Sequence, residues 1–176
     1  MLRWICAGIF KALGWKITGK LPDLKKFIII VAPHTSSWDF PLGLLARGMI
    51  DRKIRYLGKK ELFRPPFGWI FRALGGYPVD RQQSQSMVDQ VADIFENQES
   101  FLLALAPEGT RSPVTKWRTG FYHMAVKAGV PIVMIGMDYS RREIKIMEPF
   151  NPGDNIGRDL PLIQQRFQDY RGKKHI

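Results

Sequence analysis

The chain has 176 residues, a length that fits one domain and leaves little room for a second. Lysine and arginine number 27 against 16 aspartate and glutamate, a net charge of +11, while 45% of the residues are apolar. This apolar fraction excludes a mainly disordered chain. The single cysteine, Cys6, excludes an intrachain disulfide and a cysteine-rich zinc site. The three histidines are widely spaced and form no zinc-binding pair, so no metal site is expected: His34, His123 and His175.

An apolar segment opens the chain. Residues 4–10 carry no polar side chain, but a helix needs about 20 apolar residues to cross a bilayer. No small-residue cleavage site follows, which favours a retained segment over a signal peptide. Apolar residues recur at helical spacing, and cations suited to anionic headgroups lie between them: Leu2, Ile5, Ile9 and Leu13, with Arg3, Lys11 and Lys16. We therefore expect residues 1–20 to form an amphipathic, membrane-associating helix; the alternative is a helix that only packs on the domain.

Apolar runs and helical periods alternate through the rest of the chain. Residues 27–32 (FIIIVA), 101–106 and 132–137 are short apolar runs typical of strands buried on both faces. The spacing of Met87, Val91, Ile94 and Phe95 predicts a helix, and residues 121–127 predict another that ends at Gly129. Residues 132–139 and 143–147 are expected to form an antiparallel hairpin at a sheet edge.

This alternation predicts a single α/β domain, residues 21–176, with a mostly parallel central sheet flanked by helices. Ligands of open α/β sheets bind beyond the carboxyl ends of the strands. The segments to inspect are therefore residues 33–39 and 107–120, each of which follows a predicted buried strand.

The first of these segments carries His34 and Asp39. A histidine held at a strand end suits a general base. The two side chains meet only if His34 precedes a helix whose first turn contains Asp39, with Ser36 or Ser37 as the N-cap. Two alternatives stay open: a core position for His34, and an Asp39 that serves only the backbone in a capping box.

The second segment reads Pro107-Glu108-Gly109-Thr110-Arg111. A hydroxyl, an arginine and a glycine that permits close backbone approach suit the binding of a phosphate or another oxyanion. A further arginine, Arg81, ends the stretch that begins at Gly75. The alternatives are a surface pair between Arg81 and Asp80, and a Glu108 that serves mainly to orient Arg111.

In this order the motifs resemble those of the glycerolipid acyltransferase family, whose members include 1-acyl-sn-glycerol-3-phosphate acyltransferases. The family's His-x-x-x-x-Asp motif matches His34 to Asp39, its second motif matches residues 76–81, and its third matches residues 107–111. Residues 59–62 (KKEL), followed by residues 66–68 (PFG), also resemble the stretch between the first two motifs. The resemblance extends over residues 15–150.

The resemblance implies an O-acyltransferase that moves a fatty acyl group from acyl-CoA or acyl carrier protein to the free hydroxyl of a lysophospholipid, foremost 1-acyl-sn-glycerol-3-phosphate. His34 would be the general base and Asp39 its orienting acid, and no metal or other cofactor would be required. The implied substrate-binding residues are Lys60, Arg81, Glu108, Gly109, Thr110 and Arg111. The expected location is peripheral or monotopic, at an anionic surface on the cytoplasmic face of the inner membrane.

Three alternatives remain at this point. The acceptor could be another lyso-lipid, such as a lyso-aminolipid, or the protein could be a lipid-binding relative without activity. A basic nucleic-acid-binding domain would explain the net charge, but it predicts a contiguous basic stripe and gives His34 and Asp39 no role. We therefore expect no nucleic-acid partner. The aromatic residues Trp38, Phe67 and Trp69 could lie at a membrane interface, although core packing is the favoured prediction for each.

Overall fold

The computed structural model describes residues 2–50, 52–80, 86–112 and 114–174. Seven strands form one sheet in the order β1-β7-β6-β2-β5-β3-β4. Neighbouring strands are parallel except β6 and β7, so the predicted mostly parallel α/β fold is confirmed. The strands are β1 Lys16–Thr18, β2 Lys26–Ala32, β3 Ile54–Lys59, β4 Gly76–Val79, β5 Phe101–Leu105, β6 Ile132–Asp138 and β7 Glu143–Ile146.

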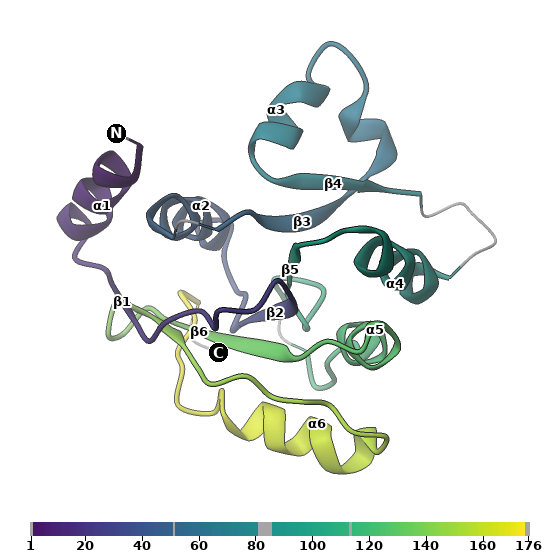
Figure 1. The fold of residues 1–176 in the computed structure, drawn as a ribbon. Helices are drawn as coiled ribbons and strands as arrows, with labels where there is room; N and C mark the ends of the chain where they lie inside the picture. The colour runs from purple at the N-terminus through teal and green to yellow at the C-terminus, as the bar shows by residue number, and fades with distance from the viewer. Residues whose placement is uncertain (1, 51, 81–85, 113, 175–176) are drawn as a thin grey trace.

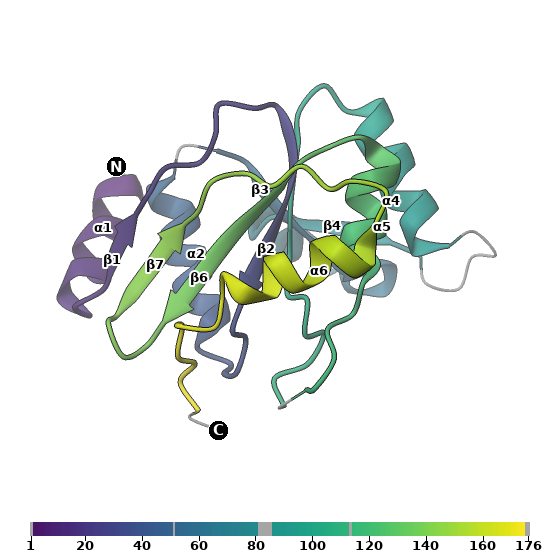
Figure 2. The ribbon, with the colours of Figure 1, turned by 90° about the horizontal axis from the view of Figure 1, so that it is seen from below.

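Helices cover both faces of this sheet (Figures 1 and 2). On one face lie α1 Leu2–Ala12 and α2 Asp39–Met49, which pack against each other. On the other face lie α4 Met87–Asn97, α5 Gly120–Ala128 and α6 Ile156–Gln165. A short segment outside these layers consists of the 3₁₀ helix η1 Lys60–Phe63 and the helix α3 Gly68–Ala73, next to β4.

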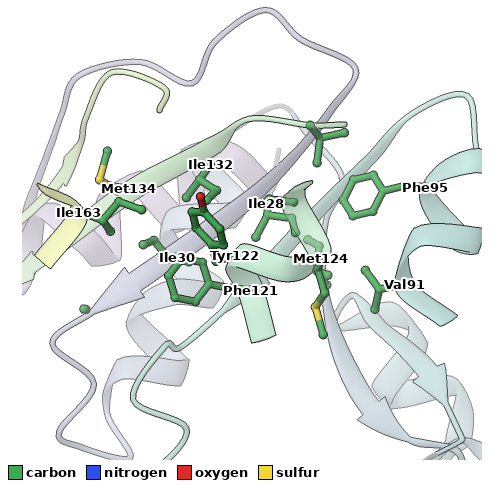
Figure 3. Packing of buried hydrophobic residues seen from close by; sticks show 14 of the residues in the cluster. Ile28, Ile30, Val91, Phe95, Phe121, Tyr122, Met124, Ile132, Met134 and Ile163 are labelled. Carbon is green, nitrogen blue, oxygen red and sulfur yellow. The ribbon is translucent and has the colours of Figure 1, made fainter. Parts of the chain in front are cut away.

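The apolar runs of the sequence become the three central strands. Alternate side chains of a strand point to opposite faces, so β2 supplies Ile28 and Ile30 to one core cluster and Phe27 and Ile29 to the other. The first cluster packs under α4, α5 and α6 (Figure 3). The second packs under α1 and α2, where Phe10 is 1% exposed. A strand covered on both faces needs an uninterrupted apolar run, which is what predicted β2, β5 and β6.

Two of the predicted helices are confirmed with small changes in their ends. The spacing from Met87 to Phe95 corresponds to α4, and residues 121–127 lie within α5. Gly129 ends α5 in the left-handed conformation at φ 63°, as expected of a C-terminal cap.

The predicted hairpin forms, but its place in the sheet differs from the prediction. β6 and β7 are antiparallel, whereas the edge strand is β1, which pairs with β7 through residues 16–18. Three residues with one apolar side chain among them give no strand signal. Residues 1–20 therefore contribute a strand to the sheet, and the predicted boundary at residue 20 stays a prediction.

The N-terminal helix presents apolar side chains on two faces. Cys6 and Phe10 are buried, and Cys6 lies against Gly48 of α2. The predicted apolar stripe instead faces outward, with Ile5 52% exposed and Ile9 46% exposed. Packing on the domain and an outward apolar face, which the sequence offered as alternatives, thus occur together. Among the described residues, no helix combines the length and apolarity needed to cross a bilayer.

Candidate active site

The segment after β2 brings His34 and Asp39 into contact. His34 Nδ1 lies 2.9 Å from Asp39 Oδ2, and Asp39 is the first residue of α2. The two side chains meet across the five-residue spacing because His34 precedes the helix while Asp39 lies in its first turn. The Asp39 side chain is 3% exposed and that of His34 is 27% exposed. The carboxylate is therefore enclosed while the imidazole remains accessible, and Nε2 is the nitrogen left to accept a proton.

The same carboxylate also binds the backbone. Asp39 Oδ2 accepts hydrogen bonds from the amides of Thr35 and Ser36, each at 2.9 Å. Asp39 thus serves the backbone and His34 at once, but the reciprocal bond of a capping box, from the Asp39 amide to the Ser36 hydroxyl, does not form. The predicted N-cap is wrong, because Trp38 occupies that position and no side chain caps α2. Ser36 Oγ instead accepts from the Trp38 amide at 3.2 Å, which closes a turn just before the helix.

Tyr139, which follows β6, supplies a fourth donor to Asp39. Its hydroxyl donates to Asp39 Oδ1 at 2.5 Å. Burial raises the pKa of Asp39, but the hydrogen bonds from His34, Tyr139 and the Ser36 amide outweigh it and hold that pKa below its usual value. Burial and the neighbouring carboxylate raise the pKa of the Tyr139 hydroxyl, which therefore remains a donor at neutral pH. Asp39 is consequently ionised and can orient the imidazole.

The sequence analysis did not include Tyr139 in the site. The signal that could have found it is the rule that led to His34, because Tyr139 also follows the carboxyl end of a buried strand. β2 and β6 are neighbours, with Ala32 opposite Gly136. Their carboxyl ends, and hence Asp39 and Tyr139, meet at one sheet edge.

Glu108 holds the His34 backbone. Its Oε2 accepts from the His34 amide at 2.6 Å, and the residue is partly buried. Burial raises the pKa of Glu108, partly opposed by that hydrogen bond and by the nearby imidazole. The Glu108 carboxylate thus links the loop that follows β5 to the loop that follows β2.

The loop after β5 also brings Arg111 to the His34 segment, where its guanidinium donates to Ser37 Oγ. Gly109 has φ 67°, and a Cβ there would lie 2.6 Å from Arg118 Cδ, so this turn needs glycine. Thr110 Oγ1 accepts from the Ser112 amide at 3.2 Å, an interaction within the loop. Two of the predicted binding residues therefore contact the His34 segment: Glu108 through the His34 amide and Arg111 through Ser37.

Lys60 and Arg81 belong to a different part of the chain. Lys60 follows β3, which is separated from β2 by β5, so the two strand ends are roughly 10 Å apart. Lys60 Nζ lies 3.5 Å from Asp80 Oδ2. The Lys60 side chain also lines a surface hollow, together with Arg64, Arg72 and other residues. Arg81 lies outside the described residues, and its predicted role stays a prediction.

An apolar cavity of about 210 Å³ adjoins the His–Asp pair. His34 and Asp39 line the cavity together with residues of α2, β3, β5, β6 and β7. Most of the lining side chains are aliphatic. Gly43 of α2 is among the lining residues, and a Cβ added there meets no atom within 4 Å. The His–Asp pair therefore faces a space suited to hydrocarbon.

The chain is similar in sequence to known proteins. A sequence model of the Acyltransferase family matches residues 16–138. A 1-acyl-sn-glycerol-3-phosphate acyltransferase of Haemophilus influenzae is 24% identical over 153 residues, which cover 82% of this chain and 62% of the relative. One of Streptococcus pneumoniae is 31% identical over 114 residues, 59% of this chain and 42% of the relative. The chain thus spans less than two thirds of these curated relatives.

The fold has a solved counterpart. The crystal structure of a 1-acyl-sn-glycerophosphate acyltransferase from Thermotoga maritima superposes with a TM-score of 0.64 at 22% sequence identity. The match covers 95% of this chain and 75% of the other. At this level of identity the similarity supports the fold.

Proposed function

Because the chain belongs to the Acyltransferase family, we propose that it transfers a fatty acyl group from an acyl thioester to the free hydroxyl of a lysophospholipid. The observation that carries the proposal is the His34–Asp39 pair, 2.9 Å apart, at the end of an apolar cavity. The relatives named above support 1-acyl-sn-glycerol-3-phosphate as the acceptor and phosphatidic acid as the product.

His34 acts as the general base. Its Nε2 takes the proton of the acceptor hydroxyl while the oxygen attacks the thioester carbonyl carbon. The carbon–sulfur bond then breaks, an ester remains, and the imidazolium returns the proton to the thiolate. Asp39 holds Nδ1 and stabilises the imidazolium that forms. The acceptor oxygen is itself the nucleophile, so Ser36 and Ser37 are not required to react.

The acyl chain occupies the apolar cavity and the acceptor phosphate lies near Arg111. Aliphatic side chains from α2, β3 and the central strands line the cavity, and water is displaced from them when hydrocarbon binds. Arg111 is our main candidate for the phosphate because its guanidinium contacts Ser37, three residues from His34, and can bind phosphate through two nitrogens. Arg81, from its place in the second motif, stays a candidate for the same phosphate, and Lys60 is a weaker one.

We also assign the protein to a membrane surface. A lysophospholipid leaves the bilayer only at a cost of about 0.8 kcal/mol for each exposed CH₂, so the enzyme must reach its substrate there. The exposed stripe of α1 and the net charge of +11 support docking on anionic lipid. The cytoplasmic face of the inner membrane remains the proposed location.

The test is acyl transfer by purified protein in mixed micelles. Acyl-CoA and acyl carrier protein serve as donors, with 1-acyl-sn-glycerol-3-phosphate, a lyso-aminolipid and glycerol 3-phosphate as acceptors. His34→Ala should lower the rate about 10²–10⁴-fold, the usual contribution of a general base. His123→Ala is the matched control, because this exposed histidine lies on α5, which covers the other face of the sheet. Unchanged transfer by His34→Ala would refute the mechanism, and transfer to the lyso-aminolipid alone would refute the phosphate acceptor.

A further inference from the structure

The segment of η1 and α3 presents large apolar side chains to solvent. Phe67 is 64% exposed and Trp69 70% exposed, and their neighbours Leu62 and Ile70 are 44% and 36% exposed. We call these four side chains the α3 patch. The predicted core packing of Phe67 and Trp69 is therefore wrong, and the reason lies in the residue that takes the interior position.

Phe63 fills the interior of this segment. It is 5% exposed and packs against Phe71 at 6.1 Å between ring centroids. Gly68 lies so close that a Cβ there would be 2.1 Å from the Phe63 carbonyl oxygen. Arg72 donates to the same carbonyl at 3.0 Å and covers the Phe63 ring. The turn is thus anchored from within, so the outward direction of Phe67 and Trp69 is a property of its packing.

The segment that carries the α3 patch has a net positive charge. Residues 59–73 contain four exposed cations and one exposed acid: Lys59, Lys60, Arg64 and Arg72 against Glu61. Such a surface repels a second copy of itself and is complementary to anionic headgroups. Tryptophan is also the side chain enriched where hydrocarbon meets headgroups. The chemistry of the patch therefore favours an anionic bilayer as its partner.

The position of the α3 patch relative to α1 and the cavity supports the same partner. Figure 1 shows α1 and the α3 segment projecting beside α2, on the side of the molecule away from α6. Leu74, the C-cap of α3, lines the apolar cavity together with residues of α2. The cavity is thus lined by elements that lie between the two exposed apolar surfaces. A bilayer is an extended partner that can contact both surfaces at once.

We propose that the α3 patch is a second bilayer-docking surface, which inserts Phe67 and Trp69 into anionic lipid while α1 contacts the same leaflet. Two contacts on either side of α2 fix the tilt of the domain, and the cavity beside His34 then faces the lipid from which substrate comes. The proposal builds on the proposed function, which places the substrate in the bilayer, but its main test, vesicle binding, requires no acyl transfer.

The experiment is sedimentation of the purified chain with vesicles. Phosphatidylcholine vesicles with and without phosphatidylglycerol are compared for the wild type and for the variant Phe67→Ala/Trp69→Ala. Full burial of one large apolar side chain is worth about a factor of ten in an equilibrium. We therefore expect the double variant to bind anionic vesicles roughly tenfold or more weakly. Leu162→Ala is the matched control, because Leu162 is 46% exposed on α6, and its binding should not change.

A fluorescent label separates insertion from a general loss of affinity. The single cysteine, Cys6, is buried, so a Cys6→Ala background carrying Trp69→Cys accepts a polarity-sensitive label at one site. The emission should shift to the blue on anionic vesicles. The same label at Leu162→Cys should not shift. Circular dichroism of each variant verifies that it is folded.

Three results would overturn the proposal. The first is equal vesicle binding by the wild type and the double variant. The second is a wild-type dimer in sedimentation velocity that the double variant abolishes, which would assign the patch to a second copy. The third is a double variant that binds vesicles normally but no longer accepts the acyl group from acyl carrier protein, while it still accepts it from acyl-CoA. This result would assign the α3 patch to acyl carrier protein. Absence of acyl transfer by a wild type that inserts Trp69 would contradict the proposed function and leave the docking surface supported.

Discussion

Replacement of Tyr139 by phenylalanine tests whether the geometry of the His–Asp pair governs the rate. The change removes the hydroxyl that donates to Asp39 at 2.5 Å and keeps the ring, which packs edge-on against Trp15 at 4.9 Å. A hydrogen bond to a charged group contributes about 1.5–3 kcal/mol. Asp39 retains its contacts with His34, Thr35 and Ser36, so the lower figure applies. About 1.5 kcal/mol corresponds to a roughly tenfold loss in kcat.

The pH dependence provides a second signature of the same variant. The Tyr139 hydrogen bond is one of the causes that lower the pKa of Asp39, so its removal raises that pKa. The acidic limb of the rate profile, where Asp39 takes up a proton and no longer orients His34, should therefore move to higher pH.

The assay is the micelle transfer reaction at several pH values, with thermal unfolding measured in parallel. Tyr122→Phe is the matched control, because its hydroxyl donates to Asp159 Oδ2 at 2.8 Å away from the site. Both variants should lose stability, and only Tyr139→Phe should lose rate and shift the profile. A wild-type rate for Tyr139→Phe, or equal rate losses in the two variants, would refute the positioning argument.

Three further changes test neighbouring contacts. Burial raises the pKa of Glu108 above its ordinary value of 4.5. As the pH rises above 4.5 the unfolded chain therefore ionises first, and the stability of the wild type falls. In Glu108→Gln this loss should be absent when thermal unfolding at pH 4 and pH 7 is compared. In Gly172→Ala the new Cβ would lie 2.4 Å from Thr35 Oγ1, so it should displace the His34 segment and lower kcat, and Thr35→Ala in the same chain should restore part of the loss. Gly43→Phe should fill open space in the cavity and shift the preferred acyl donor to shorter chains in a competition assay, with no loss of thermal stability.

The parts of the fold that the sequence predicted are those whose signal is local. The run at residues 27–32 predicted β2, and the period from Met87 to Phe95 predicted α4, because burial on two faces or on one face imposes those patterns. The edge strand β1 gave no such signal, since its three residues are placed by pairing with β7.

The contact between His34 and Asp39 could be predicted because the two residues are close in sequence, whereas the residues that support it could not. Tyr139 and Gly172 reach the His34 segment only through the order of strands and the path of the chain after α6. The outward direction of Trp69 is likewise non-local, because Phe63 and its neighbours occupy the interior that a tryptophan would otherwise fill. Apolar composition does not distinguish a side chain that the core buries from one that the core excludes.

The distribution of exposed apolar side chains connects catalysis with docking. Ten of the fourteen large hydrophobic residues that are exposed in the described chain lie at α1, at the start of α2, or at η1 and α3, whereas α5 and α6 carry one each. Contiguous apolar exposure on one side of a domain marks an interaction surface. Trp38 and Phe40 belong to this set and flank Asp39. The turn that holds the His34–Asp39 pair is therefore part of the surface that we expect to meet lipid, so we expect binding to the bilayer and access to His34 to depend on the same side chains.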